Sequence, residues 1–193
     1  MGAIHKFSLL LSLLLLLSGC ASVISATTGK DGIEENRGTR SLGAMLDDSG
    51  IETAIKVNLN AENETLKRAH INVVSFNGVV LLVGQVPSQE MKNLATRVAT
   101  SSSTRIKEVH NELEIAGSTT FLSRSNDAWL STKLKTLMLA DPVVSGLRTK
   151  VVTENGVVYL MGLVTQEEAD WTVDLVSGSS GVARVVKAFE YID

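Results

Sequence analysis

The second half of this 193-residue chain repeats the first half at a spacing of 78 residues, as the match of Gly78 with Gly156 shows. The stretch 75–86 reads SFNGVVLLVGQV, and the stretch 153–164 reads TENGVVYLMGLV. Two later valine-containing runs, which begin at Ile106 and Val182, match at a spacing of 76. Two copies of about 65–70 residues are typical of a duplicated small domain, and not of a solenoid built from short repeats.

Each copy predicts the order helix, strand, strand, helix, strand. In the first copy, apolar residues recur at helical spacing at Ile51, Ile55 and Leu59. An Asn-Gly pair follows a β-branched segment and favours a type I′ hairpin turn, because both of its residues must adopt positive φ. Ser88 is the expected N-cap of the second helix. The expected strands are 71–76, 79–83 and 109–115.

The second copy has the same signals. Its first helix is expected to turn Leu130, Leu134, Leu137 and Met138 toward the core. Thr165 is the expected N-cap of its second helix. The expected strands are 149–153, 157–161 and 185–192.

These patterns predict an α+β fold with two tandem αββαβ domains. The hairpin is antiparallel, and the strand-helix-strand connection should be parallel with a right-handed crossover. We therefore expect each domain to have a three-stranded mixed sheet that two helices cover on one face. Gly84 and Gly162 are expected to end the central strands.

The N-terminal region resembles the signal peptide of a bacterial lipoprotein. A positively charged start precedes the apolar residues 7–17, a run too short to span a bilayer comfortably. The run ends in Leu17-Ser18-Gly19-Cys20, which is similar to a lipobox. The resemblance implies cleavage before Cys20 and attachment of lipid to it, with acyl groups such as palmitate that together anchor a protein stably. The alternative is a buried free cysteine after an ordinary secretory signal.

Ala21 follows the cysteine, and by resemblance to Gram-negative sorting rules this favours the outer membrane over the inner membrane. We expect four regions: a signal peptide over 1–19, the acylated cysteine and a flexible tether over 20–47, and domains over 48–117 and 124–193. A short helix packed on the body is the alternative for part of the tether.

Composition and motifs give little indication of catalysis. The single cysteine excludes an intrachain disulfide and a cysteine-based metal cluster, and the net charge of −3 does not indicate nucleic acid binding. His70 and His110 lack metal-ligand spacing, while Glu90, Glu167 and Glu168 fit favourable charges at helix N-termini. The sequence has no phosphate loop and no nucleophile elbow. We expect a non-enzymatic protein without catalytic residues, cofactor or metal.

The repeated motifs resemble the BON domain (bacterial OsmY and nodulation). The telling pieces are Asn-Gly-Val-Val-x-Leu-x-Gly at 77–84 and 155–162, together with the final valine runs. With a lipobox in front, the chain is similar to dual-BON outer-membrane lipoproteins. The resemblance implies attachment at the periplasmic face of the outer membrane, support of envelope integrity, binding of anionic phospholipid, and enrichment at the division site. It also implies links to the outer-membrane protein assembly machinery and to regulators of division amidases.

One helix face suggests where phospholipid binds. At about 100° per residue, the outward face of the first helix of the second copy holds a tryptophan, a leucine, lysines and threonines. Tryptophan and lysine suit the headgroup level of a bilayer. The expected contact residues are Trp129, Thr132, Lys133, Lys135, Thr136 and Leu139. The first copy lacks this face, because Gly50 and Asn60 match Trp129 and Leu139. Packing of Trp129 between the copies is the alternative.

A second tryptophan, Trp171, lies between Asp170 and Asp174 and off the apolar face of its helix. We expect it to pack partly against the neighbouring copy. Two other functions remain open: a protein-binding adaptor that uses the exposed helix face, and a peptidoglycan hydrolase. The hydrolase would need a pair of convergent carboxylates, which the sequence does not reveal.

Overall fold

A computed structural model describes residues 38–117, 121–144 and 146–192. The expected signal peptide, Cys20 and the tether up to residue 37 lie outside the described residues. Within the described ranges, no helix combines the length and the apolar character that crossing a membrane requires.

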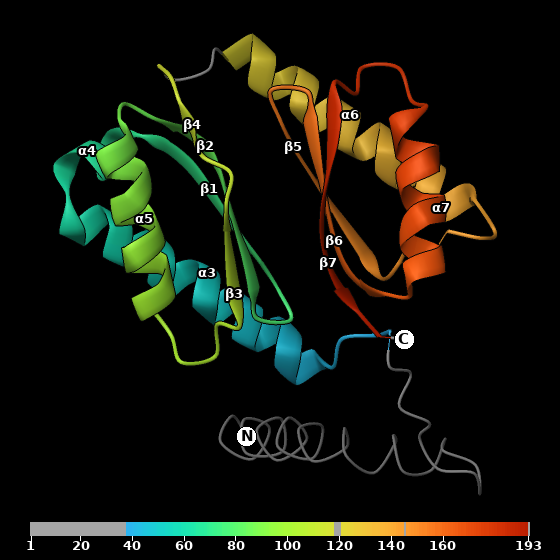
Figure 1. The fold of residues 1–193 in the computed structure, drawn as a ribbon, viewed down its shortest axis with the longest axis horizontal. Helices are drawn as coiled ribbons and strands as arrows, with labels where there is room; N and C mark the ends of the chain where they lie inside the picture. The colour runs from blue at the N-terminus through green and yellow to red at the C-terminus, as the bar shows by residue number, and fades with distance from the viewer. Residues whose placement is uncertain (1–37, 118–120, 145, 193) are drawn as a thin grey trace, which may run out of the picture. The chain divides into compact units, whose positions relative to one another are not determined.

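The first copy forms a mixed sheet with helices on one face (Figure 1). Its central strand β2 pairs antiparallel with β1 and parallel with β3 and β4. The elements are α3 (Leu42–Glu62), α4 (Glu64–Arg68), β1 (His70–Phe76), β2 (Val79–Val86), α5 (Gln89–Ser101), β3 (Glu108–Asn111) and β4 (Glu114–Ile115).

The second copy repeats this arrangement with the strand order β5-β6-β7 (Figure 1). The central strand β6 pairs antiparallel with β5 and parallel with β7. The elements are α6 (Phe121–Ala140), β5 (Thr149–Glu154), β6 (Val157–Val164), α7 (Gln166–Ser177) and β7 (Arg184–Tyr191). The α+β class and the tandem αββαβ order are therefore confirmed.

The hairpin turns and helix caps are formed by the residues that the sequence indicated. Asn77 and Asn155 have φ of 53° and 52°, and the glycine after each also has positive φ, as a type I′ turn requires. The Ser88 side chain accepts a hydrogen bond from the backbone of Met91 and caps α5. Thr165 caps α7 in a capping box with Glu168.

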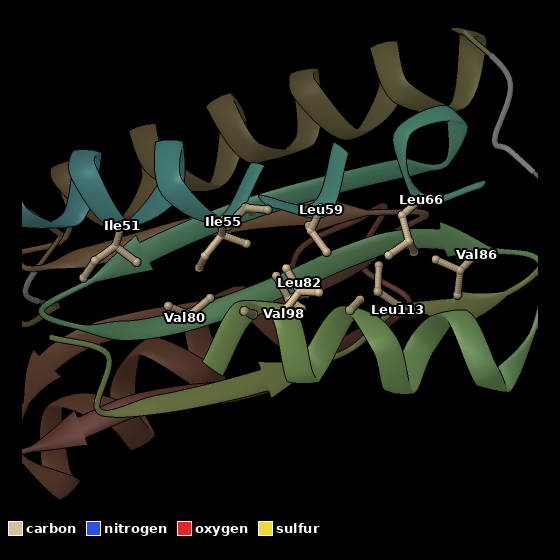
Figure 2. Packing of buried hydrophobic residues seen from close by; sticks show 12 residues of the cluster. Ile51, Ile55, Leu59, Leu66, Val80, Leu82, Val86, Val98 and Leu113 are labelled. Carbon is tan, nitrogen blue, oxygen red and sulfur yellow. The ribbon is translucent and has the colours of Figure 1, made fainter. Parts of the chain in front are cut away.

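Each central strand is buried along its whole length because both of its faces are covered. Side chains alternate between the faces of a strand. In β2, Val80 and Leu82 face the helices and pack with Ile51 and Ile55 of α3 (Figure 2). The residue between them, Leu81, points to the opposite face and joins a cluster shared by the two sheets.

This shared cluster joins the two copies through their sheets. Val79, Leu81 and Val83 of β2 pack with residues of β6, among them Tyr159 and Met161. Polar pairs add to the contact: the Gln85 amide donates to Glu154 at 2.8 Å, and Lys107 Nζ lies 2.8 Å from Glu190 Oε1. Burial of one face of each sheet against the other enlarges a core that would be thin in a single copy.

The expectation that Gly84 and Gly162 end the central strands is wrong. Both lie inside strands, opposite Ile71 and Thr149. At Gly84, φ is +124°, and a Cβ would collide with the backbone carbonyl of His70. These glycines therefore allow the neighbouring strand to approach closely instead of ending the ladder.

Element boundaries also differ from the expectations. Helix α3 begins at Leu42, capped by Ser41, so it includes residues 42–47 of the expected tether. Helix α6 begins at Phe121, three residues before the expected start of the second domain at 124. The last strand of the first copy is interrupted between Asn111 and Glu114, where the Asn111 side chain accepts a hydrogen bond from the backbone of Leu113 at 3.1 Å.

Candidate membrane-binding face

An exposed stripe runs along α6. Trp129 is 63% exposed and Leu139 is 52% exposed, and both Thr132 and Thr136 between them are exposed. Their spacing of three, four and three residues keeps these side chains on one line parallel to the helix axis. The hydroxyls of Thr132 and Thr136 donate to backbone carbonyls four residues earlier, which leaves their methyl groups as outward contact surface.

Two exposed apolar residues that were not expected from the sequence follow the end of α6. Val143 and Leu147 are 55% and 87% exposed. They lie beyond Ala140, where the helical spacing that relates Trp129 to Leu139 no longer applies. Leu137, expected in the core, is 38% exposed.

The two lysines of the predicted face have different environments. Lys133 Nζ lies 5.4 Å from the centroid of the Trp129 ring and donates to Ser180 Oγ at 2.8 Å. Its ammonium group therefore sits beside the tryptophan at the surface, where a cation–π contact stabilises it modestly.

Lys135 is not on the outward face, and this part of the prediction is wrong. Its ammonium group turns inward and donates to the carbonyl oxygen of Thr149 at 2.6 Å and to that of Gly146. Burial lowers the pKa of Lys135. A four-carbon side chain can bend away from the direction of its Cβ. Lys135 thus holds the segment after α6, which carries Leu147, against the start of β5.

The helices differ in charge. Helix α6 carries three basic residues, Arg124, Lys133 and Lys135, and one acidic residue, Asp127. Helix α7 carries four acidic residues and no basic one. Trp129 on α6 therefore has the Lys133 ammonium beside it, which suits an anionic surface, whereas Trp171 lies on a helix with four acidic residues and no basic one.

Neither tryptophan belongs to the cluster between the sheets. Trp129 is largely exposed, which contradicts its alternative placement between the copies. Trp171 is 51% exposed on a helix whose buried side is formed by Ala169, Thr172 and Val176. The expected packing of Trp171 against the neighbouring copy is therefore wrong, because the copies meet through their sheets.

A pair of structural aspartates was not expected from the sequence. In the first copy, Asp48 accepts hydrogen bonds from the backbone of Asn77 and Gly78 at 2.8 and 3.0 Å. In the second copy, Asp127 accepts them from Asn155 and Gly156 at 2.8 and 2.9 Å. Each aspartate thus ties the first helix of its copy to the hairpin turn. Their matching positions in the repeat were the available signal.

Asp48 has two further partners, the Ser75 hydroxyl at 2.7 Å and the Arg40 guanidinium at 2.8 Å. Burial alone would raise the pKa of Asp48, but the hydrogen bonds from Gly78, Ser75, Asn77 and Arg40 together lower it below its usual value. Arg40 also stacks on the Phe76 ring, 3.9 Å from its centroid.

The histidines and glutamates do not form a joint site. His70 Nε2 lies 3.6 Å from Glu154, His110 Nε2 lies 3.5 Å from Glu108, and Glu168 serves in the capping box of α7. Among the described residues, no group of three or more metal-ligating side chains could hold a metal ion.

The family model of the BON domain matches residues 47–117 and 126–193. The chain belongs to the BON-domain family. Outer membrane lipoprotein DolP of Haemophilus influenzae is 34% identical over 195 residues, which cover 100% of this chain and 99% of that protein.

Two other relatives cover the BON domains. The 21 kDa hemolysin of Actinobacillus pleuropneumoniae is 33% identical and covers 79% of this chain and 78% of that protein. The osmotically inducible protein Y of Escherichia coli is 29% identical and covers 75% of this chain and 72% of that protein. The full-length match and the two BON domains support an envelope lipoprotein of the DolP type, and the exposed tryptophan stripe belongs to the second BON domain.

Proposed function

We propose that this chain is a non-enzymatic outer-membrane lipoprotein, anchored through acyl groups on Cys20 and facing the periplasm, that binds anionic phospholipid through its second BON domain. In this role it supports envelope integrity, with the division site as its place of action. The full-length similarity to an outer membrane lipoprotein supports the anchored state. The exposed stripe on the positively charged α6 is the observation that carries the lipid-binding proposal.

In the proposed contact, the stripe on α6 is the part of the second BON domain that meets the bilayer. Helix α6 lies flat on the surface, with the Trp129 ring at the headgroup level and Leu139 beside it. Val143 and Leu147 follow from the loop, where an almost fully exposed leucine has no packing role in the folded body. Lys133 contacts lipid phosphate, and Lys135 acts indirectly by holding the loop that presents Leu147.

The test is co-flotation of residues 21–193 with vesicles, so that acylation does not contribute. We expect binding to phosphatidylglycerol-containing vesicles, little binding to phosphatidylcholine vesicles, and weakening by salt because salt screens phosphate attraction. Trp129→Glu and Leu147→Glu should abolish flotation. Trp171→Glu is the matched control, since it also removes a half-exposed tryptophan from a helix, but on acidic α7.

Two outcomes would contradict the proposal. The first is no flotation of the parent, and the second is equal loss in Trp171→Glu and Trp129→Glu while circular dichroism shows both variants folded. The stripe would then be better explained as an adaptor surface for envelope proteins such as the outer-membrane assembly machinery or amidase regulators.

A further inference from the structure

A hollow lies over the hairpin turn at the same place in both BON domains. In the first domain its volume is about 230 Å³, and in the second it is about 380 Å³. Seven lining positions correspond in the repeat. In the first domain they are Ala44, Asp47, Asp48, Ile51, Asn77, Gly78 and Arg105, and in the second Ser123, Asn126, Asp127, Leu130, Asn155, Gly156 and Gly181.

The chain itself satisfies the aspartate in the first domain. The Asp48 carboxylate accepts four hydrogen bonds: two from the turn, one from Ser75, and one from the guanidinium of Arg40. This number fills the roughly four lone-pair positions of a carboxylate. Arg40 comes from the segment before α3, and its guanidinium rests on an aromatic ring.

The second domain leaves the matching aspartate with acceptor capacity. Asp127 is only 7% exposed, and among the described residues it accepts hydrogen bonds only from the backbone of Asn155 and Gly156. The hydroxyl that matches Ser75 belongs to Thr153, which instead accepts a hydrogen bond from Ser131. Two lone-pair positions of a buried carboxylate therefore remain for further donors.

Two cations that line the first hollow are replaced in the second. At the sequence positions that match Arg105 and Lys107, the second domain has Gly181 and Ala183. Trp129 lines the second hollow instead and offers a ring at its mouth. The second hollow thus combines a buried carboxylate, an aromatic ring and more space, without the counterparts of Arg105 and Lys107; the neighbouring cation is Lys133, whose Nζ lies 5.4 Å from the centroid of the Trp129 ring and donates to Ser180.

We propose that the hollow beside Asp127 binds an arginine side chain of a partner protein. The guanidinium would donate to the two remaining positions of the carboxylate and lie near Trp129. In the first domain Arg40 donates once to Asp48 and stacks on Phe76, a ring at a different position of the repeat from Trp129. Arginine is favoured over a lipid ammonium because its fork of donors suits the two oxygens and because the first domain uses this group. This site is separate from the proposed lipid binding, and binding of the arginine probe is measured in the absence of lipid.

The test uses the full mature chain with Cys20→Ser and the probe N-acetyl-arginine amide in an NMR titration. We expect saturable shifts of the Asn155 and Gly156 amides with a Kd on the order of millimolar. The neutral isostere N-acetyl-citrulline amide should cause none. Arg40→Ala should create a second set of shifts, at Asn77 and Gly78, because it frees the matching position in the first domain.

A matched pair of variants tests the charge argument. Ala183→Lys restores the cation that Lys107 supplies in the first domain, and it should weaken probe binding several-fold. Ala183→Met adds similar bulk without charge and should bind like the parent. The proposal is overturned by absent or unsaturable shifts, by equal shifts with citrulline amide, or by equal effects of the two variants. Phosphatidylethanolamine vesicles are a further test. If they cause the same shifts and the probe cannot reverse them, the hollow binds a lipid ammonium, and the proposal is also overturned.

Discussion

Replacement of Asp48 by asparagine should destabilise the protein strongly. An asparagine keeps one acceptor oxygen but places an amide N–H group against the donors that the other carboxylate oxygen satisfied. Asp48 Oδ2 accepts from the Asn77 backbone and from Arg40, so both lose their partner in a buried place. Hydrogen bonds to a charged group contribute about 1.5–3 kcal/mol each, and the total loss should be about 3–4 kcal/mol at pH 7.

Urea denaturation followed by circular dichroism measures this loss. With a slope of roughly 2 kcal/mol per molar urea, the midpoint should fall by about 1.5–2 M. Asp47→Asn is the control, because the neighbouring Asp47 is half exposed and its ion pair with Arg105 should contribute under about 1 kcal/mol. Equal midpoints for the two variants would refute the reasoning.

The same variant has a predicted pH dependence. The pKa of Asp48 is lowered in the folded protein, so its carboxylate stabilises the fold fully above its unfolded value of about 3.9. That contribution is lost as the pH falls through the lower folded-state pKa. The difference in unfolding free energy between parent and Asp48→Asn should therefore be constant from about pH 6 to 8 and shrink below about pH 4. A difference that stays constant down to pH 2 would contradict the role of the charge.

Three further predictions concern the body of the protein. Gly84→Ala should lower the unfolding free energy by more than about 2 kcal/mol, because its φ is +124° and a Cβ would meet the His70 carbonyl. Gly50→Ala is the control in the same denaturation assay. Gly50 lies in open space on α3, so this change should raise the unfolding free energy by about 0.5–1 kcal/mol. Burial raises the pKa of Tyr159 to about 12, so absorbance at 295 nm should show a late ionisation step that Tyr159→Phe removes. The neutral phenol contributes to the unfolding free energy, and this contribution is lost as the pH rises from about 10 through 12. Ile55→Ala should cost about 3–4 kcal/mol, since Ile55 is fully buried among the helices and β2, and a loss below 1 kcal/mol would contradict that packing.

Local signals predicted the fold well because they act over a few residues. The Asn-Gly pairs at 77–78 and 155–156 require positive φ, and the structure has it. Ser88 and Thr165 cap helices because their side-chain oxygens accept from free backbone N–H groups. Because the same pattern occurs in both copies, each prediction of a helix or strand in one copy is supported by the matching segment of the other.

The errors arose where tertiary contacts decide. The helical wheel gives the direction of a Cβ atom, so it could not predict that Lys135 bends inward to the carbonyl of Thr149. The close approach of a neighbouring backbone is not visible in one segment, so the sequence could not show that Gly84 and Gly162 lie inside the central strands. The unbroken apolar run of β2 indicates that both faces of the sheet are covered, one by helices and the other by the second sheet. The copies therefore meet through their sheets, which leaves Trp171 on a helix facing outward.

The described chain begins close to the loop that carries Leu147, and this matters for a weak contact between α6 and a membrane. Gly38 is buried against the side chain of Arg148, which directly follows the exposed Leu147. Gly38 lies 18 positions after Cys20, so the chain between them spans at most about 65 Å. An anchor on Cys20 would therefore keep the loop and the α6 stripe within reach of the same leaflet, at an effective concentration on the order of millimolar. Because this concentration does not depend on bulk affinity, the proposed membrane contact would need only a weak affinity of its own in an anchored chain. The flotation of residues 21–193 would then set a lower limit on the attachment of the acylated chain.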